Sequence, residues 1–342
     1  MISRFTNSIA FAIACWATSA AFAEEQIVAP PSRAALKQAS DYSMGHNGQT
    51  FLVMFEGKIV AEHYAAGGSP DRLQMLASGS KSFVGVAAAA AVEDGIIQLD
   101  DLVCGSLVDW KDDPTKSRIT YRQLLTLTSG LKASDRAFFR TQPAWRDTAA
   151  GPMTGKPGEQ FGYGANQLNV FALALQQKLD SETFEAYLKR RILDPLGIQV
   201  QWRMRCFDGN PQVGGGGFIT SRDWASFGEF VRLQGSWKGK QIIAAEHLAD
   251  CFKGTESNPA YGQTWWLKEK ISPEVVRGNI ILRSEWAAVA NSEALPRDLV
   301  AACGAGKQRL YIIPSRRLVI VRQGGLAARS FSDVEFLSLL LR

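Results

Sequence analysis

The sequence predicts an α/β (α+β) fold, in which an antiparallel sheet is flanked by terminal helices and joined to a mainly helical lobe. Two observations predict this architecture. Hairpin patterns lie near both ends of the chain, at residues 50–65 and 308–325, and segments with helical spacing fill the middle. The simplest packing joins both hairpins in one sheet. We therefore expect one domain, residues 24–342, with a helical lobe of roughly residues 80–270 inserted between the sheet segments.

The first 23 residues have the pattern of a secretory signal peptide. Arg4 precedes an apolar run, and the small residues Ala21-Phe22-Ala23 fit a cleavage site. A membrane anchor would need about 20 apolar residues, so we expect no stable membrane insertion. Cys15 leaves a lipoprotein alternative open. The sequence thus predicts a secreted, periplasmic protein that is cut near Ala23.

The N-terminal third contains a helix, a hairpin and a second helix. Residues 33–44 have helical periodicity, and residues 50–65 form two β-prone runs around Glu56-Gly57. A helix then starts at Ser78 or Ser80 and ends at Gly95. Its small side chains at residues 87–91 would let other helices approach closely, so we expect it to be central and buried.

The rest of the chain is mostly helical before the second hairpin. Residues 132–162 are rich in glycine, proline and polar residues and predict a long irregular surface segment. Whether this segment covers a cleft stays open. A run of four glycines at 214–217 marks a tight backbone approach. Helices are expected at residues 119–131, 166–178, 182–193, 222–233, 244–252 and 330–342.

Composition excludes several classes of partner. The sequence has 46% hydrophobic and 21% charged residues, as in a globular protein with a full core. Lysine and arginine are scattered and the net charge is only +5, so we expect no nucleic-acid partner. The three histidines (His46, His63 and His247) are far apart in the sequence. We expect neither a metal site nor an organic cofactor. The oligomeric state stays open.

Four cysteines follow the signal peptide, namely Cys104, Cys206, Cys251 and Cys303. An exported protein meets an oxidising compartment, so disulfides are allowed, and four cysteines permit three full pairings. We expect one bridge, between Cys206 and Cys251, with the other two as buried thiols.

A serine and a lysine lie three residues apart at the start of the small-residue helix. Ser78 and Lys81 therefore share one helix face. A serine is a poor nucleophile until a neighbour removes its proton, and burial would lower the pKa of a lysine enough to do so. The structural alternative is a helix N-cap next to a surface lysine. No Gly-x-Ser-x-Gly motif occurs, so a serine hydrolase here would need the lysine in place of histidine.

Five ordered blocks resemble the serine β-lactamase and penicillin-binding-protein superfamily. The stretch "MLASGSKSFVGVAAAAAVEDGIIQLDDLV" is similar to its first motif block, and the other four follow in the family's order. The likeness covers roughly residues 50–325 and is greatest to the class C-related branch, which includes esterases and 6-aminohexanoate-dimer hydrolases. The other blocks are "ITYRQLLTLTSGL", "KPGEQFGYGANQLNVFALAL", "GGGGFITSRDWASFGEF" and "GKQRLYIIPSRRLVIVRQGG".

The resemblance implies a β-lactamase/DD-peptidase-like fold and specific roles for several residues. Ser78 would be the acylated nucleophile, Lys81 its general base, and Tyr163 the tyrosine that carries a proton to the leaving group. The N–H groups of Ser78 and Ala305 would stabilise the oxyanion.

Two departures from the family pattern bear on the substrate. The asparagine usual two residues after the tyrosine is Ala165 here, and Asn166 would be either a substitute polar contact or a helix N-cap.

The second departure is that "ACGAGK", residues 302–307, lacks the family's Lys/His-Thr/Ser-Gly. It resembles the nylon-oligomer-hydrolase variant, with Gly304 and Gln308 expected to contact substrate. In the family, the cation and the hydroxyl of that motif hold the carboxylate of the substrate. Without them, the binding of β-lactams and D-Ala-D-Ala peptides would be about 10- to 100-fold weaker. Lys307 or Arg309 would compensate only if it faced the site.

The resemblance therefore implies an exported serine hydrolase that cleaves a small ester, a linear amide or a peptide containing D-amino acids. Two alternatives stay open. One is a β-lactamase or low-molecular-mass penicillin-binding protein, and the other is a catalytically silent relative that binds the cell wall. The pair Trp265-Trp266 is expected to pack within the lobe, with a cleft wall as the alternative.

Overall fold

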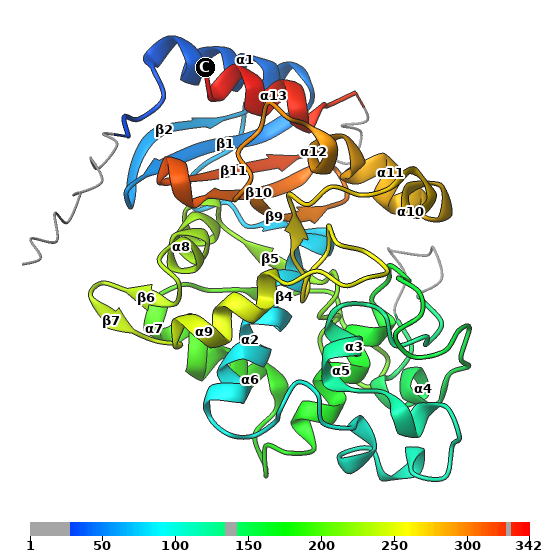
Figure 1. Ribbon diagram of the computed structural model, residues 1–342. Helices are drawn as coiled ribbons and strands as arrows, with labels where there is room; N and C mark the ends of the chain where they lie inside the picture. Colours follow the sequence, from blue (N-terminus) through cyan, green and yellow to red (C-terminus); the bar gives the residue numbers. More distant parts are fainter. Residues whose placement is uncertain (1–27, 134–141, 326–329) are drawn as a thin grey trace, which may run out of the picture.

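The largest sheet joins the two ends of the chain (Figure 1). The computed structural model describes residues 28–133, 142–325 and 330–342, so the expected signal peptide and Cys15 lie outside it. Every strand pair in this sheet is antiparallel, in the order β2-β1-β11-β10-β9-β8. The strands are β1 (Gly48–Phe55), β2 (Lys58–Tyr64), β8 (Trp266–Leu267), β9 (Val300–Gly304), β10 (Gln308–Ile313) and β11 (Leu318–Gly324).

Pairing of β1 with β11 confirms that both predicted hairpins share one sheet. The pairing runs from Gly48 opposite Gly324 to Phe55 opposite Leu318. The β1–β2 turn has positive φ at Glu56 (47°) and at Gly57 (76°), as a tight two-residue hairpin requires. Strands β8 and β9 extend the sheet beyond what the sequence pattern predicted.

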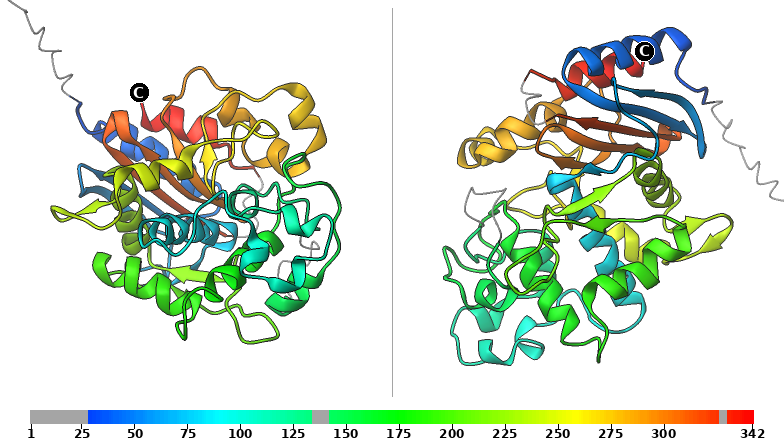
Figure 2. Two further views of the ribbon diagram at one scale, coloured as in Figure 1. Left: turned by 60° about the horizontal axis from the view of Figure 1, so that its bottom comes forward. Right: turned by 180° about the vertical axis from the view of Figure 1, so that it is seen from behind.

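Helices cover both faces of the sheet (Figures 1 and 2). The terminal helices α1 (Arg33–Gly45) and α13 (Asp333–Leu340) pack side by side on one face, and α8 (Ser221–Arg232) packs against β10, β11 and β1 on the other. Every residue of β10 and β11 is consequently buried. This explains why both strands have nearly continuous apolar runs instead of alternation.

The lobe is built around α2 (Lys81–Glu93), as the small side chains predict. Residues 81–91 are all buried, and neighbouring helices of the lobe contact α2 directly. The other lobe helices are α3 (Tyr121–Leu125), α4 (Trp145–Ala150), α5 (Asn166–Gln176), α6 (Phe184–Leu188), α7 (Asp194–Leu196) and α9 (Ala245–Ala249). Small sheets comprise β3 (Gln74–Met75) with β4 (Gln201–Trp202) and β5 (Gly217–Ile219), and β6 (Ser236–Trp237) with β7 (Lys240–Gln241).

Two regions differ from the sequence prediction. Helix α4 lies within the segment expected to be irregular, of which residues 134–141 are outside the described part. Three helices of five or six residues precede β9, namely α10 (Pro273–Gly278), α11 (Ile280–Glu285) and α12 (Ala287–Asn291). Such helices are too short to produce a clear helical period in the sequence. The side chains of Ser272 and Asn279 cap the first two.

The expected Cys206–Cys251 bridge is wrong, because all four described cysteines are free thiols. The Cys206 sulfur contacts the Asn169 amide on α5, whereas the Cys251 thiol donates to the carbonyl of Gly85 on α2. The Cys206 sulfur thus lies against α5 and the Cys251 sulfur against α2. Within the described ranges, no helix has the length and apolarity needed to cross a membrane.

Candidate active site

Ser78 lies in a short 3-10 turn, η1 (Ala77–Ser80), which leads directly into α2. Neighbouring backbone holds this turn in place. The N–H of Leu76 bonds the Gly217 carbonyl (2.9 Å), and the Ser80 hydroxyl accepts from the Gly217 N–H (3.1 Å). Ala77 adopts a φ of 47°, a left-handed conformation that is strained for a residue with a Cβ. The hydroxyl of Ser78 is therefore presented by a rigid, strained turn.

Lys81 lies one helical turn from Ser78, as their spacing predicts. A hydrogen bond joins Lys81 Nζ and Ser78 Oγ at 2.9 Å, and both side chains are buried. Lys81 Nζ also donates to the carbonyl of Gly214 (2.7 Å) and lies 4.9 Å from the centre of the Tyr163 ring. These partners are all electrically neutral.

Burial lowers the pKa of Lys81 to about 7, because transfer out of water disfavours the charged ammonium. A substantial fraction of the side chain is therefore a neutral amine near neutral pH. The Gly214 carbonyl only accepts hydrogen bonds, so it fixes one N–H of that amine. A neutral amine at this distance can take up the proton of the Ser78 hydroxyl, which makes a nucleophile and base pair.

Gly214 is part of the site, although the sequence revealed only its tight packing. A Cβ at this position would lie 2.6 Å from the Cβ of Ala165, far inside van der Waals contact. Glycine at 214 and alanine at 165 together let the two backbones approach. That approach brings the Gly214 carbonyl within reach of Lys81. The signal in the sequence was the glycine run at 214–217.

Tyr163 packs among aromatic side chains beside the Ser78–Lys81 pair. Its ring lies 5.4 Å from that of Trp266 and 6.0 Å from that of Tyr261. Burial of the hydroxyl raises the pKa of Tyr163 above its ordinary value, and the Ser78 side chain opposes this rise as a hydrogen-bond partner. The phenol therefore keeps its proton near neutral pH and can serve as a proton donor.

Strand β9 presses its C-terminal end against the turn that carries Ser78. A Cβ on Gly304 would lie 2.0 Å from the carbonyl oxygen of Leu76 and 3.0 Å from the N–H of Gly79. Ala305 follows directly, in the β9–β10 loop. Among the described residues, no backbone or side-chain acceptor is bonded to the N–H of Ser78 or of Ala305. Both donors are thus available at the same place.

Eight of the described residues line a cavity of about 90 Å³ at this point. Four of them were not expected from the sequence, or were expected mainly in packing: Trp266, Ile281, Glu285 and Cys303. Trp266 forms part of the cavity wall while Trp265 stacks on Phe227 in the core. Ile281 and Glu285 come from the unpredicted helix α11. The eight described residues that line it are Ser78, Tyr163, Trp266, Ile281, Glu285, Cys303, Gly304 and Ala305.

Cys303 is a thiol in the cavity wall with low nucleophilicity. Burial raises its pKa well above the ordinary value, with smaller opposing effects from nearby charges. Because the thiolate is the reactive form, a raised pKa leaves Ser78 as the more activated nucleophile at this cavity.

The two basic residues after the cavity loop are held by acidic partners. Arg309 is fully buried and bonds both Asp333 and Glu285, the latter with Nη2 to Oε2 at 2.8 Å. Lys307 Nζ bonds Glu285 (3.3 Å) and Asp333 (3.4 Å). Burial would lower the pKa of Arg309, but Asp333 and its other neighbours hold it well above the ordinary value. Neither cation is among the eight lining residues.

Gln308 and Asn166 also lie outside the cavity lining. Gln308 is buried and its amide bonds the backbone of Gly324 twice, at 2.6 Å and 3.1 Å. Asn166 donates to the carbonyl of Lys132 (3.1 Å). It is the first residue of α5, so Ala165 occupies the N-cap that was one of its alternatives. The expected substrate contacts of Gln308 and Asn166 stay predictions.

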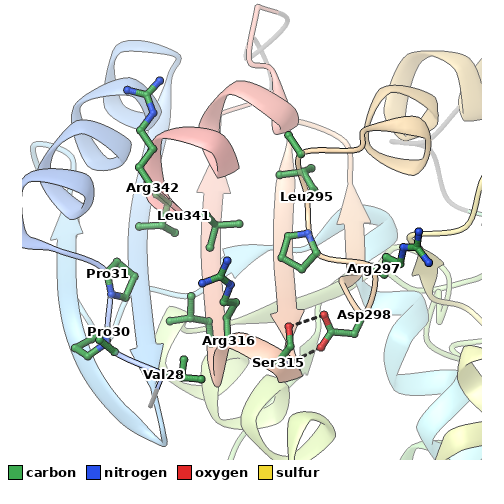
Figure 3. Close-up of a pocket in the computed structure, with 15 residues that line it drawn as sticks. Val28, Pro30, Pro31, Leu295, Arg297, Asp298, Ser315, Arg316, Leu341 and Arg342 are labelled. Carbon is green, nitrogen blue, oxygen red and sulfur yellow. Dashed lines mark hydrogen bonds between the residues drawn. The ribbon is translucent and has the colours of Figure 1, made fainter. Parts of the chain in front are cut away.

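A larger hollow, of about 1100 Å³, lies elsewhere, between residues 28–31, 294–298, 315–318 and 340–342 (Figure 3). Its polar groups include Asp298, whose carboxylate accepts from the hydroxyl of Ser315 (2.8 Å). None of its lining residues forms a nucleophile and base pair. The smaller cavity at Ser78 is therefore the candidate active site. In the part of the chain that the structure describes, no group of His, Cys, Asp or Glu side chains is arranged to hold a metal ion.

Solved structures of several hydrolases share this fold. One, provisionally assigned as a 6-aminohexanoate-dimer hydrolase from Bacillus anthracis, has a TM-score of 0.71 and 18% identity, covering 88% of this chain and 80% of that one. A D-stereospecific amidohydrolase from Streptomyces has a TM-score of 0.66 and 14% identity, covering 91% of this chain and 98% of that one. At these identities the likeness concerns the fold alone.

Sequence comparison identifies the family. A lovastatin esterase from Penicillium rubens is 27% identical over 208 residues, which is 46% of this chain and 51% of the esterase. The model of the Beta-lactamase family matches residues 34–323, most of the sequence. Both the fold and the family match expected from the motif blocks are thereby confirmed. The chain belongs to the Beta-lactamase family and is a serine hydrolase.

Proposed function

We propose that this serine hydrolase cleaves an ester or amide bond through an acyl-enzyme on Ser78. The observation that carries the proposal is the 2.9 Å contact between the Ser78 hydroxyl and the buried amine of Lys81. With a pKa of about 7, that amine takes the hydroxyl proton as the oxygen attacks the substrate carbonyl. The N–H groups of Ser78 and Ala305 stabilise the oxyanion.

Tyr163 completes the proton transfer in this proposal. The C–O or C–N bond breaks, the leaving group receives a proton from the phenol, and Lys81 returns its proton to the tyrosine oxygen. A water molecule then attacks the acyl-enzyme by the same route in reverse, which frees the acid and restores Ser78. The raised pKa of Tyr163 supports its use as a donor instead of a base.

Small esters, linear amides and peptides with D-amino acids are the proposed substrates, and export with cleavage near Ala23 is proposed from the sequence alone. β-Lactams and D-Ala-D-Ala peptides carry a carboxylate that needs a cationic partner. The eight residues around the cavity include no lysine or arginine, since Lys307 and Arg309 are held by Glu285 and Asp333. We therefore expect an aryl ester to be turned over faster than the β-lactam nitrocefin.

The test is the intact mass of the protein after exposure to a fluorophosphonate probe. One adduct should form on the wild type and none on Ser78→Ala. A matched control is Ser82→Ala, which removes a buried hydroxyl of α2 that donates to the Gly79 carbonyl in the preceding turn but keeps Ser78. This control should label like the wild type. Absence of an adduct on the wild type would contradict the proposal and favour a silent binding protein.

A further inference from the structure

Two arginines lie side by side on the large sheet. Arg309 on β10 and Arg322 on β11 are directly opposite each other, and both are fully buried. Opposite positions of an antiparallel pair place their side chains on one face, where like charges repel. Carboxylates balance Arg309, but in the described part of the chain none bonds Arg322. A methionine would fill the space of Arg322 without the cost of a buried charge, so packing alone does not explain it.

In the ranges that the structure describes, the hydrogen-bond acceptors of Arg322 are all backbone carbonyls. Its Nη1 donates to Lys307 (2.8 Å) and, at longer range, to Gly306 (3.4 Å), and its Nη2 donates to His46 at the end of α1 (2.7 Å). The guanidinium also lies 4.0 Å from the ring centre of Phe331. Burial lowers the pKa of Arg322 to about 10, so the side chain is still charged near neutral pH. Arg322 therefore joins the β9–β10 loop to α1.

The β9–β10 loop, residues 305–307, contains a strained residue. Lys307 has a φ of 57°, in the left-handed region that disfavours residues with a Cβ. Gly306 before it has a φ of 77°, which a glycine adopts without strain. A left-handed residue other than glycine persists only where its surroundings hold it. The hydrogen bond from Arg322 to the Lys307 carbonyl provides that restraint.

The same loop contains the Ala305 N–H, the second oxyanion donor of the proposed function. The carbonyl of Gly304 belongs to the same peptide unit and accepts from Arg309 Nη1 (3.2 Å). In a trans peptide the C=O and the N–H point in opposite directions, so the Ala305 N–H points away from Arg309. Arg309 thus fixes the direction of this peptide unit, and Arg322 holds the two residues that follow Ala305.

We propose that Arg322 is a positioning residue for oxyanion stabilisation. It holds Gly306 and Lys307 so that the Ala305 N–H stays directed at the substrate carbonyl oxygen as that oxygen becomes negative. The inference rests on the proposed function, which assigns the Ala305 N–H to the oxyanion. Arg322 does not line the cavity and touches no substrate atom in this scheme. Its loss should therefore weaken stabilisation of the transition state more than binding of the substrate.

The test compares p-nitrophenyl butyrate with its thiono analogue, in which sulfur replaces the carbonyl oxygen. Sulfur is larger and accepts hydrogen bonds more weakly, so correctly placed N–H donors favour the oxygen ester. Each kcat/KM is divided by the hydroxide-catalysed rate constant of the same ester. The ratio of the two normalised values is the oxygen preference, which we expect to be about tenfold or more in the wild type.

Arg322→Met should lower kcat/KM for the oxygen ester about 10- to 100-fold and bring the oxygen preference close to one. A purely structural role of Arg322 would reduce only the amount of folded enzyme. That reduction would scale the rates of both esters equally and leave the oxygen preference unchanged. The preference therefore separates positioning from stability.

Arg232→Met is the matched control. Arg232 is a largely buried arginine on α8 that pairs with Glu229, and it does not line the cavity. Its loss leaves Glu229 buried without a cation and should lower stability, but the oxygen preference should keep its wild-type value. Arg322→Lys keeps the charge and presents one nitrogen where the guanidinium uses two, so an intermediate preference is expected.

A wild-type oxygen preference in Arg322→Met, or in Arg322→Lys if only that variant folds, would overturn the inference. So would a wild-type enzyme that shows no oxygen preference. Either result leaves the acyl-enzyme on Ser78 intact, provided that turnover and fluorophosphonate labelling still require Ser78. If the wild type turns over neither ester and forms no adduct, the proposed function fails and the inference fails with it.

Discussion

Two buried cations lie close to the same cavity and behave in opposite ways. Lys81 contacts a hydroxyl, a carbonyl and an aromatic face, and burial lowers its pKa to about 7. Arg309 is equally buried but bonds Asp333 and Glu285, and its pKa stays well above the ordinary value. Burial alone would lower the pKa of both side chains, so it does not account for the difference between them.

The difference shows that the partners of a buried cation decide its use. Neutral partners stabilise the amine of Lys81 in a form that can take up a proton. Carboxylate partners keep Arg309 charged, so it cannot accept a proton. Its ion pair with Asp333 holds β10 against α13. Burial would raise the pKa of Asp333, yet Arg309 holds it below its ordinary value. Lys81 can be recognised from the Ser-x-x-Lys motif of the family, whereas the role of Arg309 is apparent only from the ion pairs packed around it.

Replacing each cation by methionine should separate the two roles, and we expect this to be the largest effect. Lys81→Met should reduce kcat/KM about 10²–10⁴-fold, because the base is lost, while the protein still folds. Arg309→Met should lower the free energy of unfolding by about 3–5 kcal/mol, because Asp333 is left buried without its cation.

Ester turnover and urea unfolding, measured on both variants, check this prediction. Lys37→Met is the control, since Lys37 forms an exposed pair with Asp41 and should change stability by less than about 1 kcal/mol. If Arg309→Met unfolds like the wild type, or Lys81→Met retains full turnover, the distinction between the two cations is wrong.

The second prediction concerns the neutral partner of Lys81. Gly214→Ala should lower kcat/KM about 10- to 100-fold, because the added methyl meets Ala165 and displaces the carbonyl that orients the amine. Gly105→Ala is the control, since a Cβ there has no atom within 4 Å. Comparable activity of Gly214→Ala and Gly105→Ala, at equal melting temperature, would count against an orienting role for Gly214.

The third prediction concerns the pH profile, in which the effect within one pH unit of neutrality is about tenfold at most. The active form of Lys81 is the neutral amine, so kcat/KM should rise with pH, reach half its plateau at about pH 7 and fall about tenfold per unit below that. The folded pKa is depressed, so the unfolded state binds more protons between about pH 7 and the unfolded pKa. Wild-type stability relative to Lys81→Met should therefore rise with pH across that window and stay constant below it. A pH-independent kcat/KM between about pH 5 and pH 8 would contradict the assignment.

Sequence reasoning predicted the parts of the fold that repeat a strong local pattern. The hairpins at 50–65 and 308–325 have β-prone runs with turn residues, and they form β1–β2 and β10–β11. The small residues of α2 correctly indicated a central helix. Strand β9 was missed because its residues, "VAACG", are too few and too small to show alternation, and the helices α10–α12 are too short.

The site could be predicted only where the chemistry lies within a motif. Ser78 and Lys81 are neighbours on one turn, so their spacing reveals their contact. Glu285 reaches the cavity through tertiary packing, and no local pattern marks it. The glycine run at 214–217 indicated a tight approach but not that the Gly214 carbonyl bonds Lys81. Gly304, at the end of β9, lies against Leu76. Gln308 begins β10 after the loop, and its side chain bonds the backbone of Gly324. The orientation of a side chain on a strand depends on a register that the sequence alone leaves open.

The pairing of β1 with β11 also has a consequence for the order of folding. Gly48 and Gly324 are partners across the sheet, so the strand next to β1 comes from the far end of the chain. Contacts of such long sequence separation form late, because loop closure is entropically costly. The helical lobe also depends on distant segments, since α2 packs against α5, α6 and α9. The N–H groups of Ser78 and Ala305 meet only when the sheet and the lobe are both in place, so fluorophosphonate labelling during refolding would report the completed fold.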